Sequence, residues 1–360
     1  MNAECRKDGV AGFMRVKNDA EFVEASIDSC IDALDELVIV YNDCSDDTPV
    51  LVEKKRMEYP DKIKVFEYRH KVYSVNLTKE EYDYASGLPD DDPGLLCNYY
   101  NYALSKVSYK YAVKIDADQI YFTDRLRVLC DIFRNGNKRR NLLKYSVGWA
   151  FNMYFVAYKF LCFRIQRAYG FLPARIVEAF SPCYMEYLRW QALSKDASLS
   201  LSGLNVVKDD GWYVCMGRKG EGINILPPFN GEGDHLIFRV TDKTYFRRFD
   251  MPYYNLLSNS SYSLIEEFVH PYRVLCAGFF WFHMNAMRER YRKDILRAKK
   301  KYVESFVPVR EFLGLRYKDI VSMADRRMYS LRQNVLFSFI YKGFRSLIKE
   351  NLNILDNMKA

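Results

Sequence analysis

Short apolar segments alternate with amphipathic segments of helical length over the first 122 residues, and this alternation constrains the fold more than any other feature. The predicted strands cover 12–16, 37–41, 62–68 and 111–115. Helical periodicity is present between them over 19–34 and 98–106. Such an order favours the α/β class, with a mostly parallel, doubly wound sheet.

Polar residues follow two of these strands directly. Asn42 and Asp43 come after the compact run LVIVY, and Asp116-Ala117-Asp118 comes after 111–115. Doubly wound sheets bind ligands beyond the carboxyl ends of their strands. Hard cations such as Mn²⁺ and Mg²⁺ prefer carboxylate oxygens and bridge them to phosphates. The sequence therefore predicts a divalent metal site at Asp116 and Asp118, with two solvated loop acids as the alternative.

Three segments, in this order, resemble the inverting family-two glycosyltransferases with the A-type fold. Residues 13–22 (FMRVKNDAEF) look like the first strand and the following helix of that family. Residues 38–48 (VIVYNDCSDDT) are similar to its second conserved strand and loop, often written V-D-D-G-S-T-D-G-T. The Asp116 triplet matches its DxD motif. The resemblance covers roughly the first third of the chain and extends to bacterial surface-polysaccharide glycosyltransferases.

The resemblance implies roles for individual residues. Nucleotide-sugar binding is implied for Arg15, Lys17, Asn18, Asn42, Asp46 and Asp116. Metal binding is implied for Asp116, Asp118 and His283, because several A-type enzymes have a late His that completes the metal site; a core-edge His is the alternative for His283. The chain departs from the family at Tyr41 and Asn42, where acids are common. An Asn amide can still bond uracil, and uridine is our first choice of base.

An inverting transferase needs a general base to deprotonate the acceptor hydroxyl, and a carboxylate is the usual solution. Within the glycine-rich segment 229–235 (FNGEGDH) we favour Asp234, with Glu232 as runner-up. His235 is a candidate to orient that base or to contact the acceptor. A polar glycine-rich turn is the alternative for this segment. Asp209 and Asp210, near Trp212, form a second candidate for the base.

Positive charge is concentrated near the C-terminus. Residues 284–349 contain 17 Lys and Arg against 6 Asp and Glu, whereas the net charge of the whole chain is +8. The apolar run 335–341, followed by Lys342, Arg345 and Lys349, suits an interfacial helix. We favour core packing for its apolar residues and membrane proximity for its basic ones. We expect no nucleic acid as a partner, because the arginines are scattered among acids without a recognised binding motif.

Other features bear on location and domains. Nine Cys without zinc-like spacing predict reduced, buried thiols in a cytoplasmic protein. Residues 1–10 lack an apolar signal segment, and 148–163 is too short and too polar to span a bilayer. Peripheral contact with the inner face of the cytoplasmic membrane is considered. The predicted domains are a catalytic domain, 1–285, and a basic helical extension, 286–360. The catalytic domain divides into a nucleotide-sugar-binding part, 1–122, and an acceptor-binding part, 123–285.

These observations together predict a metal-dependent glycosyltransferase. It would move a hexose or N-acetylhexosamine from a nucleotide-diphosphate sugar, with UDP as first choice, to a growing glycan such as lipopolysaccharide or capsule. Inversion is implied by the resemblance alone, and the acceptor is a glycan or a lipid-linked glycan. One alternative is a nucleotidyltransferase, although 13–22 lacks the glycine-rich, basic loop usual in that class. The other is a nucleic-acid-binding protein that uses the basic C-terminal region.

Overall fold

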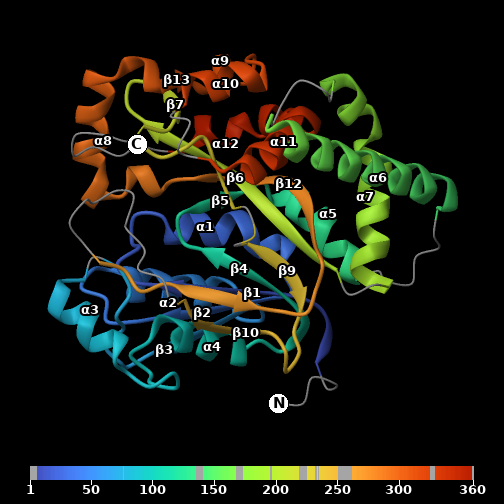
Figure 1. Ribbon diagram of the computed structural model, residues 1–360. Helices are drawn as coiled ribbons and strands as arrows, with labels where there is room; N and C mark the ends of the chain where they lie inside the picture. The colour runs from blue at the N-terminus through green and yellow to red at the C-terminus, as the bar shows by residue number, and fades with distance from the viewer. Residues whose placement is uncertain are drawn as a thin grey trace. The chain divides into compact units, whose positions relative to one another are not determined.

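The computed structural model describes residues 6–75, 77–134, 141–167, 173–194, 197–218, 225–231, 233, 235–249, 262–324 and 329–358. The chain forms two compact units (Figure 1). Unit 1 comprises Met1–Gly136 and Asp234–Arg273, and unit 2 comprises Asn137–Gly233 and Val274–Ala360. The functional division predicted at residues 122 and 285 follows other boundaries and stays a prediction.

Unit 1 contains a five-stranded run of sheet in the order β9-β4-β1-β2-β3. Its strands are β1 (Lys7–Val16), β2 (Glu36–Tyr41), β3 (Ile63–Glu67), β4 (Tyr109–Asp116) and β9 (Leu236–Arg239). The β1–β2, β1–β4 and β2–β3 pairs are parallel, whereas β9 runs antiparallel to β4. The predicted α/β class with a mostly parallel sheet is therefore confirmed, and all four predicted strands are present.

Helices connect these strands and cover the sheet. They are α1 (Val23–Cys30), α2 (Thr48–Glu58), α3 (Lys79–Ser86), α4 (Leu96–Ser105) and α5 (Thr123–Arg134). The helix predicted over 19–34 is shorter, because it gives way to a 3-10 turn, η2 (Ile31–Ala33). The remaining strands of unit 1 are β5 (Gln119–Tyr121) and the antiparallel pair β10 (Tyr245–Arg248) and β11 (Glu266–Val269).

The two-residue period of the strands determines which side chains reach the site. Ala11 and Phe13 of β1 and Ala112 of β4 belong to one buried cluster, which also includes Tyr99 and Tyr100 of α4. Because side chains alternate along a strand, the same face of the sheet continues through Arg15, Lys114 and Asp116. The register pairs Phe13 with Lys114 and Arg15 with Asp116. The apolar face under α4 thus becomes charged where the strands end.

Unit 2 has its own strands and a large set of helices. Its strands are β6 (Ser198–Lys208), β7 (Trp212–Cys215), β8 (Phe229–Asn230), β12 (Val274–His283) and β13 (Phe306–Pro308). The long β6 pairs in parallel with β12 and antiparallel with β7 and β8, and β13 pairs antiparallel with β7. All but the last residue of β6 are buried, so this strand forms the centre of the unit.

The helices of unit 2 include the predicted C-terminal extension. They are α6 (Leu142–Ile165), α7 (Ala174–Ser194), α8 (Glu289–Lys301), α9 (Val309–Phe312), α10 (Tyr317–Met323), α11 (Leu331–Glu350) and α12 (Leu352–Asn357), with the 3-10 turns η3 (Asn285–Met287) and η4 (Val303–Ser305). In α11 the residues Val335, Phe337 and Phe339 are buried, so core packing is confirmed for this apolar run. No helix within the described ranges is long and apolar enough to cross a membrane.

Candidate functional site

The predicted acidic pair lies where β4 ends. Asp116 is the last residue of the strand, and its side chain is 32% exposed. Asp118 lies two residues later, between β4 and β5, and is only 5% exposed. The hydroxyl of Ser26, on α1, donates to the backbone carbonyl of Asp116 at 3.1 Å and fixes the chain where it leaves the sheet. The pair therefore occupies the ligand-binding edge of a parallel sheet, as the sequence predicted.

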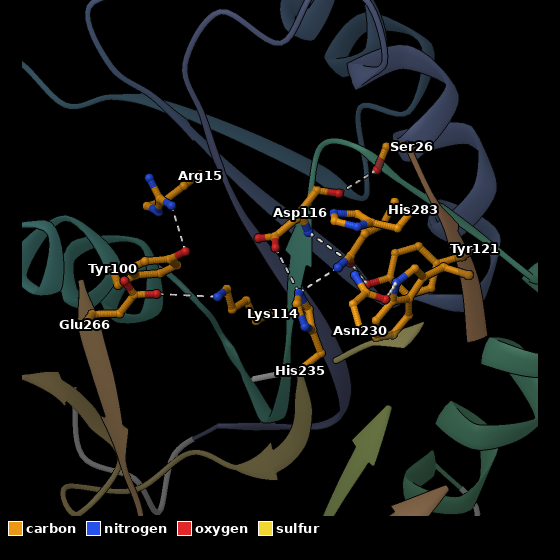
Figure 2. Close-up of polar contacts among 12 residues, drawn as sticks. Arg15, Ser26, Tyr100, Lys114, Asp116, Tyr121, Asn230, His235, Glu266 and His283 are labelled. Atoms are coloured by element: carbon orange, nitrogen blue, oxygen red, sulfur yellow. Dashed lines mark hydrogen bonds and ion pairs between the residues drawn. The ribbon is translucent and has the colours of Figure 1, made fainter. Parts of the chain in front are cut away.

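One histidine lies directly beside Asp116. His235 points toward Asp116 (Figure 2). Its Nε2 is 2.9 Å from Asp116 Oδ2 and 2.7 Å from Gln119 Nε2. The orientation of the Gln119 amide follows from its other contacts. Its Oε1 accepts from the backbone N–H of Asp116 and from the Tyr121 hydroxyl, at 3.3 and 2.6 Å. The Gln119 NH₂ group must therefore point at His235.

This orientation has a consequence for the histidine. Since Gln119 donates, His235 Nε2 presents its lone pair, and the Asp116 carboxylate 2.9 Å away is also an acceptor. Two acceptor atoms at this separation repel each other unless a proton or a metal cation lies between them. A role for His235 in orienting the base or contacting the acceptor stays a prediction. Its contact with Asp116 is not predictable from local sequence, because β9 pairs with β4 only through the tertiary fold.

Two cations and a second carboxylate lie on the other side of Asp116 (Figure 2). Arg15 donates to the Tyr100 hydroxyl at 2.7 Å, and its guanidinium lies 4.1 Å from the centre of that ring. Lys114 forms an ion pair with Glu266 of β11 at 3.5 Å, and both side chains are about one-eighth exposed, at 12% and 13%. This charged network consists of two positive and two negative side chains, those of Arg15, Lys114, Asp116 and Glu266.

This network controls the ionisation of its members. Burial alone would raise the pKa of Asp116, but the positive charges of Lys114 and Arg15 help to outweigh it, and that pKa lies well below its usual value. Asp116 is therefore a carboxylate at physiological pH. Burial raises the pKa of Tyr100 to about 12, so its hydroxyl stays neutral. Of this set the sequence predicted Arg15 and Asp116, and Lys114 follows from the strand period.

The other predicted nucleotide-sugar residues lie in the loops after β1 and β2 and join these loops together. Asn18 Oδ1 accepts from the backbone N–H of Ser45 at 2.8 Å. The Asp46 carboxylate accepts from the backbone N–H groups of Ala20 and Thr48, at 3.1 and 3.0 Å. Lys17 forms an exposed ion pair with Asp43 at 3.0 Å. These contacts give Asn18 and Asp46 a structural role, and nucleotide contact at Lys17, Asn18 and Asp46 stays a prediction.

Asn42 is almost completely buried at the end of β2, beside a pocket of about 340 Å³. Its NH₂ group donates to the backbone carbonyls of Tyr68 and His70, at 2.6 and 2.7 Å. Both residues line the pocket, and the His70 and Tyr68 rings are 5.0 Å apart. Within the described residues Asn42 Oδ1 has no hydrogen-bond partner. Asn42 therefore fixes the loop after β3 with its donors and retains only an acceptor.

The remaining candidates lie in unit 2 or outside the described residues. His283 is the last residue of β12 in unit 2, where its Nδ1 lies 2.5 Å from Asn205 Oδ1, and its metal role stays a prediction. Asp234 and Glu232, the predicted bases, lie outside the described residues. Lys299 Nζ binds both Asp209 and Asp210, at 2.7 and 2.8 Å, and its hydrogen bond lowers the pKa of Asp210, which makes Asp210 a weaker base.

No group of three or more His, Cys, Asp or Glu side chains that could hold a metal is present in the described part of the chain. The cysteines within this part are free thiols, and most of them are buried.

An acidic pair is located at the carboxyl end of a central parallel strand, and a pocket lies at the carboxyl ends of β2 and β3, which is where doubly wound sheets bind nucleotides. Residues 7–169 match the family model described as Beta-1,4-N-acetylgalactosaminyltransferase (CgtA). The matched family is one of glycosyltransferases, the class that the sequence predicts, and the matched residues include all three motifs from which that class was predicted.

Solved structures give more limited similarity. Glucosyl-3-phosphoglycerate synthase from Mycobacterium tuberculosis, in complex with Mn²⁺, uridine diphosphate and phosphoglyceric acid, is 18% identical with a TM-score of 0.21, over 31% of this chain and 34% of that one. Staphylococcus aureus TarS 1–349, in complex with UDP, is 18% identical with a TM-score of 0.22, over 34% and 31%. The chain thus spans about a third of the length of these proteins. A search of curated proteins gives no match.

Proposed function

We propose that this chain is a metal-dependent, inverting glycosyltransferase that uses a UDP-sugar. It would move a hexose or N-acetylhexosamine to a growing surface glycan, such as lipopolysaccharide or capsule. One observation carries the proposal. Asp116, at the end of β4, is kept ionised yet one-third exposed, and Asp118 lies two residues away. A site that maintains an accessible carboxylate among buried charges is suited to a charged ligand.

The residues present fit a divalent cation. Asp116 Oδ2 and His235 Nε2 are two acceptor atoms 2.9 Å apart, and a shared cation relieves their repulsion. Asp116 and Asp118 would hold Mn²⁺ or Mg²⁺ beside His235, and diphosphate oxygens and water would complete the coordination, as is usual for Mg²⁺. When bound, the cation neutralises the charge that develops on the nucleoside diphosphate leaving group. The similar synthase from M. tuberculosis was solved with Mn²⁺ and UDP, which supports this assignment.

Asn42 supports uridine as the base. With both amide hydrogens donated to Tyr68 and His70, only the acceptor Oδ1 is left to bind a base. Uracil offers the donor N3–H, whereas the unprotonated N3 of cytosine is itself an acceptor. We therefore expect UDP to raise the thermal midpoint more than CDP does, in the presence of Mn²⁺. Equal stabilisation by UDP and CDP would mean that Asn42 does not select the base.

The decisive experiment measures sugar transfer and identifies the released nucleotide. Release of nucleoside diphosphate supports sugar transfer, whereas pyrophosphate would indicate a nucleotidyltransferase. Asp118→Ala, and the isosteric Asp118→Asn, should abolish Mn²⁺-dependent transfer. Asp124→Ala, which changes an acid 92% exposed at the start of α5, is the matched control and should retain activity. Full activity in both Asp118 variants would refute the metal assignment.

The catalytic base is tested separately. Asp234→Asn should lower turnover much more than donor affinity, because a general base acts on the acceptor hydroxyl and not on the donor. Glu232→Gln is the comparison variant, since Glu232 is the runner-up. A larger loss in Glu232→Gln than in Asp234→Asn would exchange the two roles. Analysis of the anomeric configuration of the product decides whether transfer inverts.

A further inference from the structure

The long helix α6 of unit 2 leaves much of its apolar surface uncovered. Leu143 is 76% exposed, Trp149 51% and Phe160 68%. Met153, Val156 and Phe163 are also exposed. An alternating spacing of four and three residues makes one stripe along a helix, and the exposed residues with this spacing are 149, 153, 156, 160 and 163. We call this stripe, with the exposed Lys159 and Arg164, the α6 face. Contiguous exposed apolar surface of this kind marks an interaction site.

The opposite side of the same helix is already anchored within unit 2. The Phe155 ring stacks on Phe339 of α11 with centres 4.0 Å apart, and Phe151 stacks on Phe180 of α7 at 5.7 Å. A Cβ at Gly148 would lie 2.1 Å from the Cys183 carbonyl oxygen, so α6 and α7 are in close backbone contact there. Packing therefore explains the apolar residues of one side only. The α6 face needs a different apolar environment.

Charge identifies the environment. Between Asp131 and Glu178 the sequence has no acidic residue, whereas Lys and Arg occur at nine positions. On α6 itself the charged residues are Lys144, Lys159 and Arg164, all exposed. A second copy of the chain would bring the same positive charge to the interface and be repelled. An anionic phospholipid surface offers both the negative charge and the apolar layer that such a helix requires.

We propose that the α6 face docks in the headgroup region of an anionic phospholipid membrane. Trp149 and Phe160 enter the boundary between headgroups and acyl chains, and Lys159 and Arg164 bind lipid phosphates. At 1.5 Å per residue the 24 residues of α6 extend about 36 Å, which is long enough to lie along the surface. The biological value of this contact rests on the proposed lipid-linked acceptor, but the contact itself requires neither donor nor acceptor.

The test is cosedimentation of the full chain with vesicles, without nucleotide sugar, metal or acceptor. We expect binding to vesicles with about 30% phosphatidylglycerol, little binding to pure phosphatidylcholine, and weakening in about 0.5 M NaCl. Trp149→Ser with Phe160→Ser, and separately Lys159→Glu with Arg164→Glu, should each lower binding at least about tenfold. Lys300→Glu, on the exposed side of α8, which has more basic residues than α6, is the control and should stay within about twofold.

Two results would overturn the proposal. One is equal vesicle binding by the wild type and both double variants, with unchanged thermal midpoints to show that the variants are folded. The other is a wild-type dimer that Trp149→Ser with Phe160→Ser converts to a monomer, because that would assign the face to a second copy of the chain. Sugar transfer to a soluble acceptor, measured in parallel, shows whether the proposed enzymatic function holds independently of vesicle binding.

Discussion

The network at the end of β4 and the α6 face differ in whether their charges are paired and in whether their apolar side chains are buried. In the network, the positive charges of Arg15 and Lys114 are balanced by the negative charges of Asp116 and Glu266. The apolar cluster on the same face of the sheet is buried. At the α6 face, cations have no acids near them in the sequence, and large apolar side chains are exposed. A site for chemistry compensates its charges internally, whereas a site for association leaves them for its partner.

The largest expected effect separates these two sites by activity. Asp116→Asn should lower kcat/KM for sugar transfer by about 10³-fold, because it removes the ionised carboxylate from the network. The same variant should bind anionic vesicles like the wild type. Conversely, Trp149→Ser with Phe160→Ser should transfer sugar to a soluble acceptor at a rate within about twofold of the wild type. A loss of both properties in either variant would show that the two regions do not act separately.

Replacing Phe by Ala should change the stability of the protein by different amounts on the two sides of α6. Phe155→Ala removes a buried ring stacked on Phe339 and should lower the free energy of unfolding by about 3 kcal/mol. Phe160→Ala removes an exposed ring and should change it by less than about 0.5 kcal/mol. Urea denaturation measures both values. Similar losses in the two variants would mean that Phe160 is packed in the folded chain.

Two lysines of β4 offer a comparable test of the charged network. Lys114→Met breaks a largely buried ion pair with Glu266 and should cost about 2 kcal/mol. Lys110→Met breaks an exposed pair with Asp8, 2.7 Å long, and should cost less than about 0.5 kcal/mol. Chemical denaturation of both variants at the same ionic strength gives the comparison. A stable Lys114→Met variant would argue that the Glu266 carboxylate is satisfied by other groups.

The smallest expected effect concerns two asparagines with opposite hydrogen-bonding roles. Asn42→Asp places a carboxylate oxygen against the carbonyls of Tyr68 and His70, so it should destabilise the fold by about 1 kcal/mol, although the resembling family commonly has an acid there. Asn18→Asp keeps the acceptor for the Ser45 N–H and should be nearly neutral. Thermal midpoints at neutral pH distinguish the two. An equally stable Asn42→Asp variant would place the Asn42 amide in the opposite orientation.

The sequence predicts the strand ends of unit 1 well because local signals determine them. Apolar runs mark β1, β2, β3 and β4, and the residue type after each run indicates chemistry at Asp116 and Asn42. Lys114 was accessible to the same reasoning, since a period of two from Asp116 places it on the same face.

The partners of Asp116 from later in the chain were not predictable in this way. His235 reaches Asp116 through β9, and Glu266 reaches Lys114 through β11, so both depend on strands more than a hundred residues distant in sequence. The exposed apolar surface of α6 was likewise not predictable, and membrane proximity of Lys342, Arg345 and Lys349 stays a prediction. The apolar residues of α11 are buried, whereas those of α6 are exposed, and hydropathy alone does not distinguish a buried helix side from an open one.

Unit 1 is made of two separated stretches of chain, and this has a consequence for biosynthesis. Residues 137–233 must be synthesised after the parallel strands and before β9 and β11. At about 5–20 residues per second, the nascent sheet waits roughly 5–20 s with its β4 edge unpaired by β9 and Asp116 without His235. A protein arranged in this way is exposed to aggregation during that interval, and chaperone binding to the nascent chain would be expected to concentrate on β4.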